Sequence, residues 1–404
     1  MKARKAIAAV LTAVMLACVS GCGKQADTPS DTSQSVSTTS SESTSTTSDT
    51  SSSTESTSTT EDTDITEEPE TMPLTAAEIV SQMRVGWNLG NTLDALGGGD
   101  VGSETAWGNP VTTKGMIDRV KEAGFNVLRV PVTWGTHVDA DFNIDPAWLD
   151  RVQEVVDYGI DNDMFVILNT HHEEWYMPDN AHAEEDIKHL EKLWTQIAER
   201  FKDYDEKLLF EGVNEPRLRN TGDEWTGNAE AREVVNRYAE TFVRAVRATG
   251  GNNAERSLLI TPYSASSMSE NLRALRVPEN AGNIIVSVHA YLPYNFALNT
   301  QGTSVYENDG SVNYLMNDIK TIFLDNNIPV VITEFGAMNK NNTDDRLRCV
   351  EDFLTAAKAI NVPCLWWDNN YKEGEGETFG LLDRNGNGWF FPELVDKIMS
   401  IVGE

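Results

Sequence analysis

Short runs of apolar, mostly β-branched residues recur eight times along the chain, and most are followed by a stretch with helical spacing. The predicted strands cover 84–89, 126–132, 165–169, 208–213, 257–261, 284–288, 330–333 and 363–367. Their near-continuous apolarity is typical of strands that are buried on both faces, as in a parallel sheet.

Between these strands, apolar residues return every three or four positions, which indicates amphipathic helices. Asp145 and Pro146 form an N-cap followed by proline in the first turn, a common helix start. The helices predicted in this way cover 146–160, 184–201, 229–248, 312–324, 346–360 and 393–402.

Eight strand-helix units over about 330 residues predict a single (β/α)8 barrel, an α/β fold. A doubly wound open sheet is the alternative. It is less consistent with the sequence, because no glycine-rich phosphate fingerprint follows the first strand, and Gly86 and Gly90 lack the spacing of that motif.

The beginning of the chain has a different composition. A basic region at 2–5 precedes an apolar stretch at 6–19, which is too short to span a membrane permanently and is typical of a secretory signal. The stretch ends in Val19-Ser20-Gly21-Cys22, which resembles a bacterial lipobox. We therefore predict a lipoprotein signal peptide over 1–21 with lipid attachment at Cys22. An ordinary signal peptide with an incidental cysteine is the alternative.

Residues 22–73 consist almost wholly of Ser, Thr, Asp and Glu. Such a segment cannot bury enough apolar surface to offset its ordering entropy, so we expect a disordered tether. The folded domain is expected to span 74–404. The protein is then expected to be secreted and to stay at the bacterial cell surface through its lipid.

The formal net charge of −31 comes in good part from this acidic segment. An acidic surface argues against nucleic acid and anionic lipid as partners, but it is compatible with a neutral polymer. We therefore expect membrane contact only through the lipid at Cys22, and we expect a monomer.

Two cysteines, Cys349 and Cys364, fall in the folded part. A helix of several turns would separate them by roughly 15 Å at 1.5 Å per residue, which is beyond disulfide reach. Both are predicted to be buried free thiols, and no cysteine or histidine spacing resembles a zinc site.

The candidate chemistry centres on two glutamates, Glu215 and Glu334, at the downstream ends of the predicted fourth and seventh strands. Catalytic groups of a barrel sit at these ends. Hydrolysis of a glycosidic bond needs two carboxyl groups, one that gives a proton and one that stays ionised. The alternative is that each glutamate is a loop carboxylate or pairs with an arginine.

Other polar and aromatic residues lie near the downstream ends of the predicted strands or just after them. They are Asn91, Asp94, Arg129, Trp134, His171, His172, Glu173, Asn214, His289, Tyr291, Trp366, Trp367, Asp368 and Asn369. Aromatic faces stack on sugar rings, and amides, imidazoles and carboxylates bind hydroxyl groups, so this set suits a sugar.

Several phrases carry a specific resemblance. They are 86–94 (GWNLGNTLD), 104–110 (ETAWGNP), 129–134 (RVPVTW), 169–173 (NTHHE), 210–216 (FEGVNEP), 287–291 (SVHAY), 333–336 (TEFG), 366–369 (WWDN) and 379–384 (FGLLDR). From about residue 75 onward the chain resembles glycoside hydrolase family 5, and most closely its subfamily 4 endoglucanases.

The resemblance implies a retaining, double-displacement mechanism with Glu215 as acid/base and Glu334 as nucleophile. It matches Arg129 and Tyr291 to the residues that keep the nucleophile ionised, and Asn214 to the residue that binds the sugar 2-hydroxyl. It also matches His171 and His289 to histidines of the barrel mouth.

The resemblance further makes Trp367 the stacking platform at the cleavage point and places Asn91 and His172 on the non-reducing side. Asp94 and Asn369 are expected to bind substrate as well. Trp107, Trp134, Trp175 and Tyr294 are candidates for further platforms, and each could instead be a packing residue.

The implied activity is that of a retaining endo-β-1,4-glucanase acting on plant cell-wall β-glucans, with no cofactor. A xyloglucan-specific, xylan-active or mannan-active endo-hydrolase and a non-catalytic polysaccharide-binding surface protein stay open as alternatives. Metal-assisted hydrolysis through His171, His172, Glu173 and His182 is another, although no metal is expected. The stretch 383–388 resembles the start of a calcium loop but lacks its last ligand, and a turn is expected.

Overall fold

The computed structural model describes residues 74–386 and 388–403, in which eight parallel strands close into a barrel in chain order. The strands are β1 Val85–Leu89, β2 Val127–Val130, β3 Phe165–Asn169, β4 Leu208–Glu211, β5 Leu258–Ile260, β6 Ile284–His289, β7 Val330–Phe335 and β8 Cys364–Asp368. Strand β8 pairs with β1 along the whole length of both. The barrel prediction is therefore confirmed, and the open-sheet alternative is wrong.

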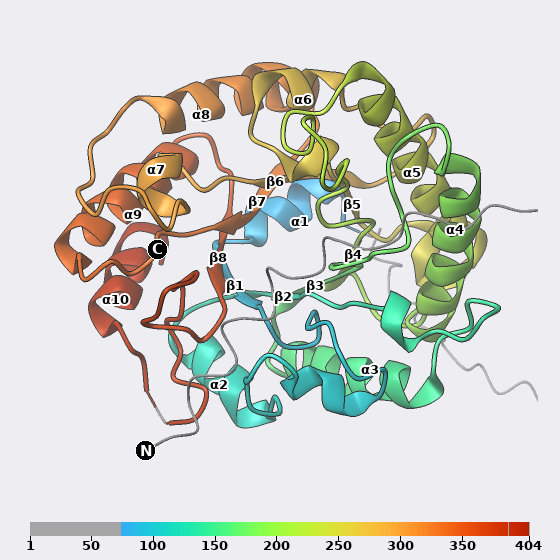
Figure 1. The fold of residues 1–404 in the computed structure, drawn as a ribbon, viewed down its shortest axis with the longest axis horizontal. Helices are drawn as coiled ribbons and strands as arrows, with labels where there is room; N and C mark the ends of the chain where they lie inside the picture. Colours follow the sequence, from blue (N-terminus) through green and yellow to red (C-terminus); the bar gives the residue numbers. More distant parts are fainter. Residues whose placement is uncertain (1–73, 387, 404) are drawn as a thin grey trace, which may run out of the picture. The chain divides into compact units, whose positions relative to one another are not determined.

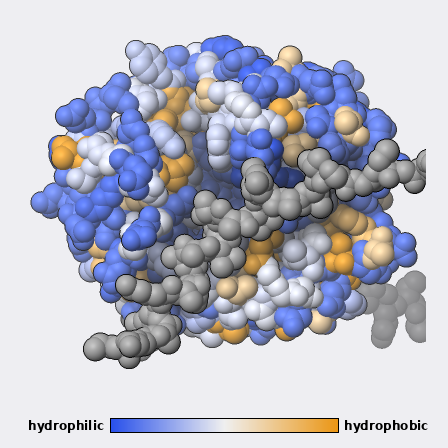
Figure 2. Space-filling model, in the orientation of Figure 1, coloured by the Kyte–Doolittle hydropathy of each residue, from blue (hydrophilic) through white to orange (hydrophobic). Residues whose placement is uncertain are grey.

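Most of the helices surround the barrel on its outside, and α1 lies across one end of it (Figure 1). They are α1 Ala76–Gln82, α2 Lys114–Glu122, α3 Pro146–Asp161, α4 Ala183–Arg200, α5 Ala229–Ala248, α6 Ser269–Ala274, α7 Tyr294–Ala297, α8 Ser311–Ile322, α9 Thr343–Lys358 and α10 Pro392–Val402. Helix α7 lies within the β6–α8 connection, and α1 precedes the first strand. The face drawn in Figure 2 is mostly hydrophilic and carries its apolar residues in small, separate groups.

Each strand alternates between two environments, because successive side chains point to opposite faces of a strand. In β2, Leu128 and Val130 belong to the large cluster between barrel and helices, whereas Val127 belongs to a second cluster inside the barrel. Near the amino-terminal ends of the strands, the side chains on both faces are apolar. This explains the near-continuous apolar runs in the sequence.

The inside of the barrel changes from apolar to polar along the strand direction. Its lower layer packs against α1, the helix that closes this end, and comprises Ala76, Ile79, Val80, Met83, Val127, Phe165, Ile167, Leu209, Leu259, Ile285, Val331 and Leu365. The next layer, toward the carboxyl ends of the strands, contains buried polar residues, among them Asn88, Arg129, Asn169, Glu211, Ser287 and Thr333. The carboxyl ends of the strands are therefore the functional end.

The two strand ends that carry the catalytic glutamates differ from the prediction. Strand β4 ends at Glu211, so Glu215 lies four residues beyond it in the connecting loop. Strand β7 instead runs to Phe335 and includes Glu334, with irregular registers against β6 and β8 near this residue. Such irregularities re-aim side chains at barrel rims, and here His289 and Glu334 become direct neighbours.

The predicted signal peptide, the attachment site Cys22 and the linker 22–73 lie outside the described residues. Within 74–386 and 388–403, no helix has the length and apolarity needed to cross a bilayer. Cys349 and Cys364 are both buried and free, as predicted.

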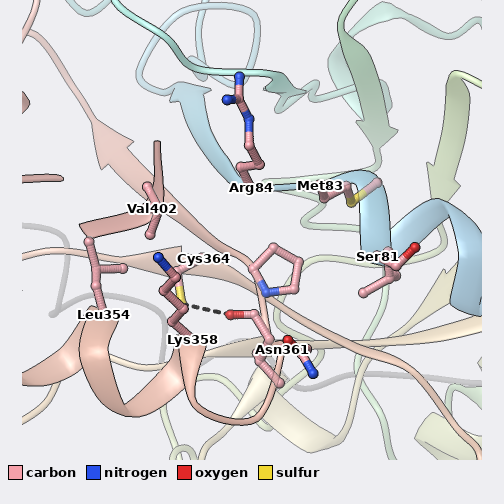
Figure 3. Close-up of a pocket in the computed structure, with 11 residues that line it drawn as sticks. Ser81, Met83, Arg84, Leu354, Lys358, Asn361, Cys364 and Val402 are labelled. Carbon is pink, nitrogen blue, oxygen red and sulfur yellow. Dashed lines mark hydrogen bonds between the residues drawn. The ribbon is translucent and has the colours of Figure 1, made fainter. Parts of the chain in front are cut away.

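A cavity of about 390 Å³ lies at the amino-terminal end of the strands, beside α1 and the start of β8 (Figure 3). Apolar side chains form much of its lining, and the Cys364 thiol donates to the Val362 carbonyl there. Its two cations, Arg84 and Lys358, already donate to backbone carbonyls near the C-terminus. This cavity is at the opposite end of the barrel from Glu215 and Glu334.

The helix that closes the barrel should matter for stability and not for chemistry. Ile79→Ala is expected to lower the free energy of unfolding by about 2–4 kcal/mol, because it opens a cavity in a fully packed layer. Chemical denaturation would measure the loss. Ser81→Ala on the exposed side of the same helix is the matched control, with a change within about 0.5 kcal/mol. Equal effects of the two variants would contradict this account.

Candidate active site

Arg129 is the centre of the polar layer. Its Nε donates to Glu211 at 2.7 Å, its Nη1 to Glu334 at 2.6 Å and to Asn88 at 2.9 Å, and its Nη2 to Asn214 at 2.8 Å. Burial favours the neutral form, but the carboxylates of Glu211 and Glu334 outweigh it and raise the pKa of Arg129 above its ordinary value. The guanidinium therefore stays charged and fixes four side chains from three other strand ends.

Glu334 is held from two sides. One carboxyl oxygen accepts from Arg129, and the other accepts from the Tyr291 hydroxyl at 2.8 Å. Burial and the charge of Glu334 raise the pKa of Tyr291 well above its ordinary value, so the phenol remains a donor. Each oxygen of the Glu334 carboxyl group therefore has its own fixed donor.

His289 contacts both Glu215 and Glu334. The His289 Nδ1 atom lies 2.8 Å from one oxygen of Glu215 and 3.4 Å from one oxygen of Glu334. A carboxyl oxygen of Glu215 and one of Glu334 lie within 4.8 Å of each other. This spacing is close to the separation of about 5 Å that retaining glycosidases use, and it is shorter than that of inverting ones.

The hydrogen bond between Glu215 and His289 holds a proton between two groups that can each carry it. Burial raises the pKa of Glu215, but the hydrogen bond and positive charge of His289, together with Arg217, lower it below its ordinary value. The Glu215 carboxyl group therefore lies in direct contact with an imidazole nitrogen, 2.8 Å away, that can exchange a proton with it.

The orientation of Asn214 follows from Arg129. Because the Asn214 carbonyl oxygen accepts from the guanidinium, its NH2 group is directed away from Arg129. An amide donor fixed in this way, one residue before Glu215, suits a sugar hydroxyl at the cleavage point.

Two histidines and a tryptophan line the neighbouring part of the mouth. The ring of Trp367 lies parallel to that of His171, with ring centres 5.5 Å apart, and His171 packs edge-on against His172. Burial lowers the pKa of His172 to about 4, so it is neutral near pH 7. A Cβ at Gly90 would lie 2.7 Å from the Trp367 ring, so glycine is required there.

Trp107 extends this wall of the mouth. Its ring centre lies 5.5 Å from that of His172, and its carbonyl accepts from the Tyr371 hydroxyl. Asn91 borders a neighbouring cavity of about 490 Å³ beneath residues 373–377. Substrate contacts by Trp107 and Asn91 stay a prediction.

Three residues that are predicted to bind substrate make hydrogen bonds within the protein instead. Trp134 is fully buried and donates its indole N–H to the Asn169 carbonyl, so it is a packing residue and offers no face to a sugar. Asp94 is also fully buried and accepts from the backbone N–H groups of Asn91 and Thr92. The side chain of Asn369 makes three hydrogen bonds within its own loop.

The two remaining candidate platforms are separate from these. Trp175 is half-buried, with its indole N–H bound to Glu173 at 2.6 Å, whereas Tyr294 is 57% exposed at the start of α7. Of the two, only Tyr294 keeps a large free aromatic surface.

The four residues of the metal-assisted alternative do not assemble as one set. Glu173 accepts from the backbone of Trp134 and Gly135 and from the Trp175 indole, and His182 pairs with Asp179. Two other groups, Asp94 with His171 and His172 and Glu215 with His289 and Glu334, have potential ligand atoms within 4.8 Å. Asp383 accepts from the N–H groups of Asn385 and Gly386, as expected for a turn.

Sequence reasoning missed three charged residues of the site. Glu211, fully buried, is the second anion of Arg129, and its signal was a carboxylate inside an apolar run. Arg217 contacts Glu215, and its signal was its position two residues downstream. Glu377 stands in a glycine-rich loop, where burial and the charges of Glu215 and Glu334 raise its pKa to about 7.

Comparisons with known proteins agree with this geometry. A family model described as Cellulase (glycosyl hydrolase family 5) matches residues 96–373. The chain is 53% identical to Endoglucanase 1 of Ruminococcus albus over 332 residues, which cover 81% of this chain and 82% of that protein.

Solved structures show the same similarity. A GH5-4 broad specificity endoglucanase from Ruminococcus champanellensis with bound cellotriose matches with a TM-score of 0.79 and 48% identity, over 82% of this chain and 99% of that one. A xyloglucan-specific endo-β-1,4-glucanase from a metagenomic library, XEG5A, matches with a TM-score of 0.78 and 42% identity, over 80% and 98%. The chain therefore belongs to glycosyl hydrolase family 5.

Proposed function

We propose that this protein is a retaining endo-β-1,4-glucanase that hydrolyses internal bonds of plant cell-wall β-glucans. The observation that carries the proposal is the placement of Glu215 and Glu334, with carboxyl oxygens within 4.8 Å and different hydrogen-bond partners. The related endoglucanases support the substrate class.

In the first step, the Glu334 carboxylate attacks the anomeric carbon and displaces the glycosidic oxygen. Arg129 and Tyr291 hold the carboxylate in place for this attack. The leaving oxygen takes its proton from Glu215, whose carboxyl group is held by His289 at 2.8 Å. Asn214 donates to the sugar 2-hydroxyl, a contact that strengthens as positive charge develops on the ring.

In the second step, the roles of Glu215 reverse. As a carboxylate it accepts a proton from water, and the resulting hydroxide attacks the anomeric carbon of the glycosyl ester on Glu334. The ester breaks, Glu334 leaves as a carboxylate, and the β configuration is restored after two inversions. Burial raises the pKa of Glu215, but His289 and Arg217 lower it below its ordinary value, and a lowered pKa suits this basic step.

The polymer within the β-glucan class is left to experiment, because single groove residues can decide it. The solved relatives are described as broad specificity, as xyloglucan-specific and as a lichenase. Cellulose-type, mixed-linkage and xyloglucan chains are therefore the proposed substrates.

We also propose that the enzyme is exported and held at the bacterial cell surface by a lipid on Cys22, with residues 22–73 as the tether. The support is the lipobox-like end of the apolar segment 6–19 and the Ser, Thr and acidic composition that follows. Labelling of cells with a fatty-acid probe would show a labelled wild type and an unlabelled Cys22→Ala variant, and equal labelling would refute the anchor.

The substrate proposal predicts release of reducing ends from carboxymethyl cellulose, lichenan and xyloglucan, with lower rates on xylan and mannan. Initial rates on the five polymers would measure this order. The same rates are expected after chelation and dialysis, because the two carboxyl groups suffice for the reaction. Binding without release of reducing ends would favour a polysaccharide-binding protein, and loss of activity after chelation would favour a metal.

The two glutamates should respond differently to the leaving group. Glu334→Gln is expected to lose at least about a hundredfold in turnover on every substrate. Glu215→Gln should lose as much on polysaccharide but form the glycosyl-enzyme rapidly from dinitrophenyl β-cellobioside, whose leaving group needs no acid. Azide, a nucleophile that needs no base, should restore its turnover. If azide instead restored turnover of Glu334→Gln and not of Glu215→Gln, the acid/base and nucleophile roles would have to be exchanged.

Retention of configuration is a direct outcome of the carboxyl spacing. Proton NMR of the first product, before mutarotation, is expected to show the β anomer, since carboxyl groups about 5 Å apart leave no space for an inverting water. An α product would show inversion and remove Glu334 from the nucleophile role.

A further inference from the structure

Arg217 lies in the β4–α5 loop and turns back toward the catalytic carboxyl group. Its Nη1 donates to the Glu215 backbone carbonyl and to Oε2 of the Glu215 side chain, both at 3.2 Å. His289 contacts the other oxygen, Oε1, at 2.8 Å. The two oxygens of Glu215 thus have different partners from different strand ends.

The guanidinium is itself held in place. Its Nε lies 3.3 Å from Glu224, and its plane lies over the ring of Trp225 with 4.7 Å between the guanidinium carbon and the ring centre. Trp225 remains 57% exposed. Arg217 therefore bridges the catalytic carboxyl group and an open aromatic surface beside it.

The loop that carries Arg217 is anchored to a buried side chain from β5's end. The Tyr263 hydroxyl accepts from the Leu218 N–H at 2.8 Å and lies within 3.0 Å of the carbonyls of Asp223 and Glu224. Tyr263 is 1% exposed. The position of Arg217 is thus set by the fold and not by a free surface loop.

We propose that Arg217 is a positioning residue for the acid/base: it holds one oxygen of Glu215 while His289 holds the other, so the carboxyl plane cannot turn. The inference rests on the acid/base role proposed above for Glu215. With both oxygens restrained, the carboxyl group faces the leaving oxygen in the first step and the attacking water in the second.

Arg217 also acts through its charge. The ionisable groups that face Glu215 are His172, Tyr176, Arg217, His289, Tyr291, Glu334 and Glu377. Among them Arg217 is a fixed cation, and a cation favours loss of the proton that Glu215 and His289 share. Its removal therefore raises the pH at which this pair loses its proton, whichever of the two carries it.

The test compares Arg217→Gln, Arg217→Lys and Arg219→Gln with the wild type. Arg219 is the matched control, because it lies in the same loop but donates to the carbonyls of Glu173, Glu174 and Tyr176. The pH dependence of kcat/KM on phenyl and dinitrophenyl β-cellobioside reports the acid in the free enzyme. Imidazole NMR of His289 gives the same proton loss without any turnover.

For Arg217→Gln we expect the alkaline limb of the kcat/KM pH profile to move up by about one pH unit, and the midpoint of the His289 NMR titration to move up by the same amount. Its rate on the phenyl glycoside should fall several-fold, with little change on the dinitrophenyl glycoside, whose departure needs no acid. Arg217→Lys, which keeps the charge, should stay near the wild-type limb, and Arg219→Gln should not move it.

An unmoved limb and unmoved His289 titration in Arg217→Gln would overturn the proposal, as would an equal displacement in Arg219→Gln. A wild type inactive on both glycosides would instead refute the proposed function. The His289 titration would still decide whether Arg217 controls the proton of the pair.

Discussion

The structure depends on one buried cation. Arg129 lies inside the barrel with no exposed surface, where an isolated charge would cost several kcal/mol even after relaxation. Two carboxylates and two side-chain amide oxygens satisfy it, and they come from β1, the β4 end and β7. The inner layer at this level has to be polar, because replacing either anion would leave the guanidinium incompletely paired.

The same pairing separates the roles of its two carboxylates. Glu211 is completely enclosed and also accepts from Ser287, so all its contacts are used inside the barrel. Glu334 is 5% exposed and faces the mouth, where Tyr291 provides its second donor. One arginine thus neutralises a structural anion below and orients a reactive anion above, and the irregular end of β7 makes the difference between them.

Most of the fold could be predicted because strands buried on two faces leave continuous apolar runs that a pattern can detect. The pattern could not show which face of a strand points inward, so Glu211 remained hidden in an apolar run. It could not place Trp134 either, since an aromatic residue after a strand can turn into the core or the groove. The path of Arg217 depends on Tyr263, 46 positions further along, and no local motif encodes such a contact.

The mouth of the barrel holds more carboxyl groups than arginines. Several of these carboxyl groups have a raised pKa and therefore keep a proton more readily than usual. Burial raises the pKa of Asp94, Glu173 and Glu377 to about 7, and Glu215 and Glu334 add to the effect at Glu377. Among the described residues, the arginines that contact the catalytic pair are Arg129 and Arg217, and His289 lies against both glutamates. A neutral glucan enters such a site without electrostatic cost, whereas a polymer of uronic acids would be repelled. The charge balance that makes the chemistry possible therefore also favours uncharged sugars.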